Sequence, residues 1–227
     1  LDKPMPQKKF FVVLGLGTFG SALAEQLHKN GCRVTGVDAN RERVENLKDA
    51  LYEAVVGDVT SRDTLAQLSL DACDAVFISL GESQNIAPSV LATLHCRELG
   101  AKRIIVKGLS RDHAKILEAM GVDRVVFPET EIAVSLADRM AWPNVLDYMP
   151  IDPDYSFAEI AVPDSLVGHT LLQTDLRRRY NIWVVGVKDA LTGKLTMFPD
   201  PDYTFGADQL IVIVARKDEL NRFREVK

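Results

Sequence analysis

Short apolar runs alternate with amphipathic stretches along the first half of the chain. β-branched and aromatic residues predict six buried strands, at Phe10–Leu14, Arg33–Val37, Ala54–Val56, Ala75–Ser79, Arg103–Val106 and Arg124–Phe127. Apolar residues at helical spacing predict helices between most of them, at Ser21–Lys29, after Asn40, at Ile86–Leu99 and at His113–Met120. Strands that alternate with helices of this length predict an α/β, Rossmann-like parallel sheet with helices on both faces.

The pattern changes in the second half of the chain. Glu129–Met140 is predicted to be a helix, and Pro143, Pro150 and Pro153 follow it. We therefore expect a nucleotide-binding domain over residues 1–141, a crossover segment or linker over 142–152, and a small α+β subdomain over 153–227. The expected elements of this subdomain are strands at Phe157–Val162, Ile182–Val187, Leu195–Phe198 and Leu210–Ala215, and helices at Leu171–Arg179 and Lys217–Phe223.

Composition narrows the function classes. The 227 residues are 47% hydrophobic, which suits one large domain, or a standard domain with a small one. The net charge of −5 gives no reason to expect a nucleic-acid partner or an anionic lipid surface. No stretch approaches the ~20 apolar residues of a membrane span, so we expect no direct membrane insertion. Because the chain begins with Leu1 and not with methionine, it is open whether a longer protein contains a membrane segment.

Three cysteines, at positions 32, 73 and 96, have no metal-binding or redox spacing. An odd number of scattered cysteines is typical of reduced thiols in the cytoplasm. We expect each of them to be a small core residue.

A glycine-rich loop follows the first predicted strand. Its residues are Gly15, Leu16, Gly17, Thr18, Phe19 and Gly20. In a G-x-G-x-x-G loop the first glycine allows a sharp turn, the second lets the backbone approach a pyrophosphate, and the third lets the helix pack on the sheet. A helix N-terminus also favours negative charge. The strand before the loop and the helix after it favour a nucleotide site over a simple tight turn.

Asp38 ends the second predicted strand, about twenty residues beyond the loop. An acidic side chain there accepts hydrogen bonds from the hydroxyls of ribose and repels a 2′-phosphate, so NADP is disfavoured. Ala39, the next residue, is also expected to belong to the nucleotide site. Asp58 follows the third strand, where a place beside adenine and a simple turn role are equally plausible. Ser79, Leu80 and Gly81 end the fourth strand and are expected to line the cleft.

Catalytic machinery is not evident. No Tyr-x-x-x-Lys, His-Glu-x-x-His, Gly-x-Ser-x-Gly or Gly-Lys-Ser/Thr motif occurs. The histidines at 28, 95 and 113 fall on predicted helices, and His169 falls in a loop. We therefore expect no catalytic residues and favour a nucleotide sensor over an enzyme. The alternative is an NAD-dependent oxidoreductase with an unrecognised proton donor.

Several segments resemble one family. VLGLGTFGSALAEQL, VTGVD, VVGDVT and GVDRVVFPE, followed by VPDSLVGHTLLQTDL, NIWVVGV and FGADQLIVIV, are similar to RCK (regulator of potassium conductance) proteins. The likeness is greatest to the cytosolic regulatory subunits of Ktr and Trk potassium uptake systems. It implies a non-enzymatic protein that dimerises and forms an octameric gating ring. The ring would lie beneath a membrane potassium-translocating subunit, peripheral at the inner face of the cell membrane.

The resemblance also implies ligands. NAD(H), ADP or ATP would bind at the loop, with Lys107 and Glu129 near the phosphates across a dimer. Without the resemblance, Lys107 would be a surface charge at a strand end and Glu129 an acidic residue at a helix N-terminus. Ktr subunits commonly carry arginine where this chain has Thr18. Because threonine brings no positive charge to a terminal phosphate, NAD(H) or ADP is favoured over ATP as the ligand. The metal ligands are unknown, although a divalent cation is compatible with such a site. Cyclic di-AMP binds the C-terminal subdomain of some members, and no residue here demonstrates that site.

One stripe of the predicted helix at Glu129–Met140 is apolar, through Ile132, Leu136 and Met140. The family uses this region as a crossover between subunits, whereas packing on the chain's own sheet is the simpler alternative. A third hypothesis is that the chain is a regulatory domain from a longer channel or antiporter.

Overall fold

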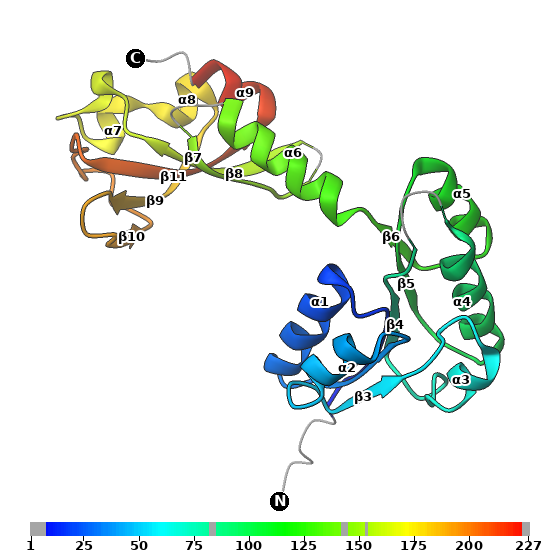
Figure 1. Ribbon diagram of the computed structural model, residues 1–227. Coiled ribbons are helices and arrows are strands. Elements are labelled where there is room, and N and C mark those ends of the chain that lie inside the picture. The colour runs from blue at the N-terminus through cyan, green and yellow to red at the C-terminus, as the bar shows by residue number, and fades with distance from the viewer. Residues whose placement is uncertain (1–7, 82–84, 142–144, 153, 224–227) are drawn as a thin grey trace, which may run out of the picture. The chain divides into compact units, whose positions relative to one another are not determined.

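The computed structural model describes residues 8–81, 85–141, 145–152 and 154–223. The chain forms two compact units, residues 1–128 and 129–227 (Figure 1). The first unit ends before the boundary at residue 141 that we expected from the sequence, so nearly all of helix α6 (Pro128–Ala141) belongs with the second unit.

The first unit is built on a six-stranded sheet. Its order is β3-β2-β1-β4-β5-β6, and every neighbouring pair is parallel. This order, with its reversal at β1 and β4, is that of the Rossmann fold. The strands are β1 (Phe10–Leu14), β2 (Arg33–Asp38), β3 (Glu53–Val56), β4 (Ala75–Ile78), β5 (Ile104–Lys107) and β6 (Arg124–Val126).

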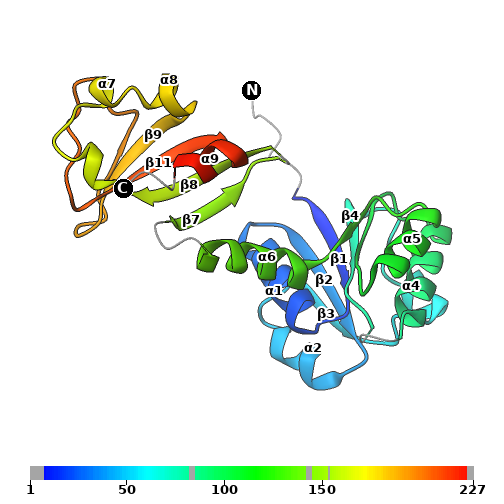
Figure 2. The same ribbon diagram turned by 90° about the horizontal axis from the view of Figure 1, so that it is seen from above.

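Helices cover both faces of this sheet, as the alternating pattern predicts (Figures 1 and 2). One apolar cluster joins the sheet to α1 (Thr18–Lys29) and α2 (Arg41–Leu47). The other lies beneath α3 (Arg62–Ala66), α4 (Ala87–Glu98) and α5 (Arg111–Ala119). Cys73 and Cys96 are buried in this second cluster as free thiols, in agreement with the expected core role.

Two local features of the first unit differ from the expected elements. Helix α1 begins at Thr18, three residues before the predicted start, so the last three residues of the glycine motif form its first turn. Helix α3 has five residues and is absent from the expected elements. It begins after Ser61, whose side chain accepts a hydrogen bond from the Thr64 N–H, and it buries Leu65.

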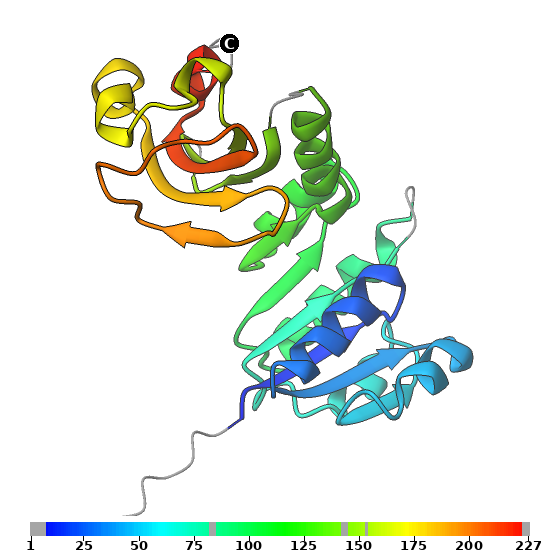
Figure 3. The same cartoon turned by 90° about the vertical axis from the view of Figure 1, so that its left-hand side faces the viewer.

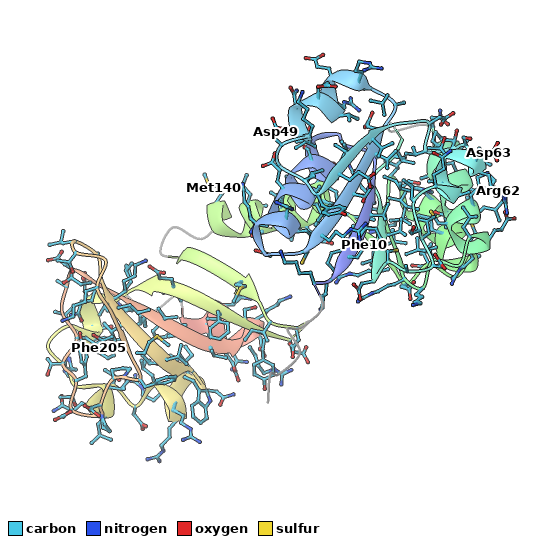
Figure 4. All side chains as sticks on the ribbon, turned by 90° about the horizontal axis from the view of Figure 1, so that it is seen from below. Phe10, Asp49, Arg62, Asp63, Met140 and Phe205 are labelled. Atoms are coloured by element: carbon cyan, nitrogen blue, oxygen red, sulfur yellow. The ribbon has the colours of Figure 1, made fainter. Side chains whose placement is uncertain are left out.

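The second unit is a small α+β structure, as expected. Its sheet has the order β10-β9-β11-β8-β7, and its neighbouring strands are antiparallel. Figure 3 shows the curvature of this sheet. Its core includes Ile160, Ile211, Phe205 and Phe223, and Figure 4 shows Phe205 among the packed side chains. The elements are β7 (Val145–Pro150), β8 (Tyr155–Ala161), a 3₁₀ turn (Asp164–Leu166), α7 (Leu171–Thr174), α8 (Leu176–Tyr180), β9 (Trp183–Asp189), β10 (Leu195–Met197), β11 (Gln209–Arg216) and α9 (Lys217–Phe223).

Two elements in this part of the chain differ from the expected ones. The segment 142–152 is expected to be a crossover or linker, yet Val145–Pro150 forms strand β7 and pairs with β8. Residues 142–144 lie outside the described residues. The single helix predicted over Leu171–Arg179 is two short helices, because Asp175 adopts a left-handed backbone conformation with φ of 48° and interrupts it.

Helix α6 carries the predicted apolar stripe on its surface. Ile132 is 68% exposed, Leu136 is 56% exposed and Met140 is 78% exposed. Figure 4 shows Met140 pointing outward from the helix. Among the residues that the structure describes, no helix has the length and apolar content needed to cross a bilayer.

Candidate nucleotide-binding site

The glycine loop lies where the strand order of the first sheet reverses. β1 pairs with β2 on one side and with β4 on the other, with Leu14 beside both Val37 and Ile78. The chain leaves the sheet at Gly15, beyond the carboxyl end of β1. In open parallel sheets, ligands bind in the crevice at such a point.

Gly15 and Gly20 fill the tight part of the loop. Gly15 has φ of +92°, and a Cβ atom on it would clash with the carbonyl oxygen of Ser79. A Cβ atom on Gly20 would clash with the carbonyl oxygen of Gly15. Helix α1 can therefore approach the strand end only because both residues lack a side chain.

Gly17 is different, because no atom outside its own stretch of chain lies within 4 Å of the position where its Cβ would be. It is the N-cap of the 12-residue helix α1, and the first turn contains no acidic residue. The N–H groups of a first helical turn have no partner within the helix, and the helix dipole favours an anion beside them. The open space at Gly17 leaves the approach to these N–H groups unobstructed by a side chain at this position.

Asp38 binds the loop directly. Its Oδ2 atom accepts a hydrogen bond of 2.7 Å from the Leu16 N–H, and its Oδ1 atom accepts one of 2.8 Å from the Asn40 N–H. The Gly15 N–H donates to the Val37 carbonyl oxygen, also at 2.8 Å. The side chain of Leu16 is buried in the core. The Leu16 N–H is thus already engaged, so a phosphate would meet the N–H groups from Gly17 onward.

Arg43 belongs to this part of the structure and is missing from the residues predicted from the sequence. Its Nη1 atom lies 3.4 Å from Asp38 Oδ2, and its side chain is 54% exposed. It stands in the first turn of α2, which begins after Asn40. The Asn40 side chain accepts hydrogen bonds from the N–H groups of Glu42 and Arg43. The only signal for it in the sequence is a basic residue five positions beyond the acidic strand end, near the start of the next predicted helix.

The remaining predicted residues of the first unit lie around the loop in different roles. Ser79 is half-buried against Gly15, and Leu80 packs partly in the core. Thr18 and Ala39 are exposed, Phe19 is half-buried, and Gly81 has φ of +92° in the loop after β4. Their contact with a ligand stays a prediction.

Asp58 is exposed and forms a local turn. Its Oδ1 atom accepts hydrogen bonds from the side chain and the N–H of Thr60, at 2.7 and 2.9 Å. These two bonds hold the pKa of the carboxyl group below its usual value. The geometry accounts for Asp58 as a turn residue, and its place beside adenine stays a prediction.

Lys107 and Glu129 fall in different units. Lys107 is the last residue of β5 and is half-buried. Glu129 is exposed in the first turn of α6, within the second unit. Their roles near the phosphates therefore stay predictions.

A buried histidine fixes the loop that follows Lys107. His113 Nδ1 accepts a hydrogen bond of 3.2 Å from the Leu109 N–H, and Nε2 lies 2.9 Å from Ser89 Oγ. Ser89 Oγ donates to the Ile86 carbonyl oxygen at 2.8 Å. Desolvation by burial lowers the pKa of His113. A neutral, fully bonded imidazole of this kind has a structural role.

No group of three or more histidine, cysteine, aspartate or glutamate side chains within the described ranges could hold a metal ion. Burial raises the pKa of Cys73 to about 11 and that of Cys96 to about 12, so both remain protonated thiols at neutral pH.

The second unit contains a pocket of about 500 Å³. Its walls include the apolar side chains of Leu171, Leu172 and Trp183, with Arg177 and Arg178 beside them. The Arg177 guanidinium lies 3.9 Å from the centre of the Trp183 ring. An aromatic face next to two cations suits a planar, negatively charged ligand.

Two domain families match the chain. Residues 11–128 match the TrkA-N domain, and residues 157–227 match the TrkA-C domain. The Ktr system potassium uptake protein C of Bacillus subtilis is 33% identical over 219 residues, which cover 96% of this chain and 97% of that protein. The Ktr system potassium uptake protein A of Vibrio alginolyticus is 33% identical, with 93% and 94% covered.

Two solved structures share the fold. The GsuK RCK domain aligns with a TM-score of 0.63 at 20% identity, covering 99% of this chain and 48% of that one. The GsuK channel bound to NAD aligns with a TM-score of 0.62 at 21% identity, covering 99% and 40%. This chain thus spans half or less of those two chains. With both domains matched in order along almost its whole length, it belongs to the TrkA-N/TrkA-C family of Ktr and Trk potassium uptake proteins.

Proposed function

We propose that this chain is a nucleotide-sensing regulatory subunit of a Ktr- or Trk-type potassium uptake system, without enzymatic activity. The family and the two-unit fold support a regulatory role. The main support for a nucleotide site is the hydrogen bond that the Leu16 N–H donates to Asp38 Oδ2. This bond places a carboxylate beside a glycine loop whose open position, Gly17, lies at a helix N-terminus.

The ligand in this proposal is an adenine nucleotide. Phosphates bind at the N-terminus of α1, and the hydroxyls of ribose bind Asp38 through the lone pairs that Leu16 and Asn40 leave available. Thr18 supplies no positive charge, which favours NAD(H) or ADP over ATP. A divalent cation would enter with the nucleotide phosphates.

Assembly turns binding into a signal. We place the exposed stripe of Ile132, Leu136 and Met140 at a contact between subunits, because large apolar side chains at this exposure favour burial. In this proposal the chain forms dimers that close into an octameric ring. The ring lies in the cytoplasm against the potassium-translocating subunit, and Lys107 and Glu129 sense the phosphates across the dimer.

A second ligand is proposed for the pocket of the second unit. Cyclic di-AMP has two purine rings and two phosphates, which match a tryptophan face and the cations Arg177 and Arg178. Calorimetry with cyclic di-AMP tests this site, and Trp183→Ala should weaken binding at least tenfold. Equal affinity in the two proteins would overturn the assignment.

The main proposal is tested in two steps. Mass spectrometry of the small molecules released from purified, denatured protein identifies the bound nucleotide. Potassium flux is then measured in vesicles that contain the pore subunit from the same genome, with and without this chain and that nucleotide. A flux that changes only when both are present supports the proposal, and an unchanged flux overturns it. Steady oxidation of NADH with a candidate substrate would favour the oxidoreductase alternative.

A further inference from the structure

The guanidinium of Arg43 lies beside Asp38, at the proposed ribose site. Arg43 Nη1 shares Asp38 Oδ2 with the Leu16 N–H, at 3.4 and 2.7 Å. The carboxylate side chain is only 9% exposed, whereas that of Arg43 is 54% exposed. The guanidinium therefore occupies the solvent side of the carboxylate, which is the side that a ribose must approach.

The exposure of the guanidinium limits how firmly it is held. Ion pairs in contact with water contribute little to stability, and the bond to Asp38 is a single, long one. The buried carboxylate is more strongly fixed, since two backbone N–H groups also bind it. Arg43 can consequently leave Asp38 without disturbing the glycine loop.

Asp38 and Arg43 prefer different substituents at the 2′ position of ribose. A 2′-hydroxyl donates a hydrogen bond to a carboxylate, whereas a 2′-phosphate is repelled by a carboxylate and binds a guanidinium. Asp38 and Arg43 thus present opposite preferences within 3.4 Å of each other. The preference of the carboxylate determines the choice of ligand, because Asp38 neutralises the Arg43 cation and lies closer to the glycine loop.

We infer that Arg43 is a specificity-determining residue for the 2′ position of ribose. Asp38 keeps the guanidinium engaged and selects a 2′-hydroxyl. If Asp38 loses its charge, Arg43 is released and the same site takes a 2′-phosphorylated adenine nucleotide. This inference rests on the proposed nucleotide site.

The test compares NADH with NADPH, by fluorescence titration and calorimetry. Asp38→Asn removes the charge, keeps the side-chain volume and retains an oxygen that can accept from the Leu16 N–H. The double variant Asp38→Asn with Arg43→Gln removes the proposed phosphate receptor as well. The matched control combines Asp38→Asn with Arg41→Gln, because Arg41 is exposed and begins the same helix.

The wild-type chain should bind NADH at least tenfold more tightly than NADPH. Asp38→Asn should lower that ratio tenfold or more, chiefly by tighter NADPH binding. Adding Arg43→Gln should weaken NADPH binding ten- to a hundredfold, the range of a lost charge-assisted hydrogen bond. Adding Arg41→Gln should change NADPH binding less than threefold.

Equal NADPH affinity in Asp38→Asn and in its Arg43→Gln derivative would overturn the role of Arg43. Wild-type binding of NADH would then remain, which distinguishes this failure from failure of the nucleotide site. A wild-type chain that binds neither nucleotide would overturn both. Circular dichroism verifies folding, and Asp38→Ser is the second variant if Asp38→Asn does not fold.

Discussion

The imidazole of His113 and the hydroxyl of Ser89 lie 2.9 Å apart inside the first unit and join helix α5 to helix α4. Because the Leu109 N–H donates to Nδ1, the proton of the neutral ring is on Nε2 and points to Ser89. The ring thus links the first turn of α4 to the loop after β5, which contains Leu109.

This arrangement predicts a stability that depends on pH. Protonation of Nδ1 would remove the acceptor of the Leu109 N–H, and burial already lowers the pKa of His113 in the folded state. The unfolded chain, with a histidine pKa of about 6.5, binds the proton first as the pH falls. Stability should therefore be retained above pH ~6.5 and decrease below it until the folded pKa is passed, by up to about 1.4 kcal/mol per pH unit.

Urea unfolding at pH 7.5 and 5.5 measures this loss. The His113→Gln variant should be less stable than the wild-type chain at pH 7.5 but should show a smaller decrease on acidification. His28→Gln is the matched control, because His28 is exposed on α1 and should leave the decrease unchanged. An identical decrease in the His113→Gln variant and the wild-type chain would contradict the prediction.

Gly17, which precedes the first turn of α1, and Gly20, which lies within it, should respond oppositely to substitution. Gly17→Val places a side chain in open space, so the chain should fold with a stability within about 1 kcal/mol of the wild type and lose nucleotide binding. Gly20→Ala forces a Cβ against the Gly15 carbonyl and should cost at least about 1–3 kcal/mol. Thermal unfolding and calorimetry together separate the effects, and unchanged nucleotide binding by a folded Gly17→Val variant would refute the loop assignment.

Removing the Asp38 side chain should weaken the fold as well as binding. In Asp38→Ala the buried Leu16 N–H loses its acceptor, which costs about 1–3 kcal/mol of unfolding free energy. Nucleotide binding should weaken about ten- to a hundredfold. Asp58→Ala is the control, because that carboxylate is exposed and both of its described hydrogen bonds come from Thr60, within its own turn. Equal stability of the two variants in urea would show that the Asp38 bond contributes little.

The apolar stripe of α6 should mediate self-association. Leu136→Glu places a charge at a position that is already half-exposed in the single chain, so the unfolding free energy should change by less than about 1 kcal/mol. Light scattering should show an assembly larger than a dimer for the wild-type chain and a smaller one for Leu136→Glu. Thr130→Glu, roughly 120° around the helix from Leu136 and outside the stripe, should leave the mass unchanged. A wild-type monomer in every nucleotide would exclude the proposed ring.

Much of the first unit could be predicted from sequence because most of its strands are short runs of apolar and β-branched residues bounded by turn residues. Helix α3 could not, since five residues with one buried leucine show no periodicity. The break at Asp175 could not be predicted either. Leu176 is buried, as a continuing helix would require, and the left-handed backbone of Asp175 has no signature in the sequence. Strand β7 depends on its pairing with β8, which no local pattern encodes.

The candidate site divides in the same way. The glycine loop and Asp38 have sequence signatures because their chemistry requires fixed residue types at fixed spacing. Arg43 has no such signature, since its contact with Asp38 depends on where α2 begins and how its first turn faces the strand end. The occupied state of the Leu16 N–H is likewise a property of folded geometry.

The bonds from Gly15 to Val37 and from Leu16 to Asp38 have a kinetic consequence. They shape the loop within the chain itself, so a nucleotide need not order that part of the loop when it binds. Competing nucleotides would then associate at similar rates and differ mainly in how long they remain bound. A sensor of this kind exchanges its ligand continuously and reports the ratio of two nucleotide concentrations, with no threshold in either one.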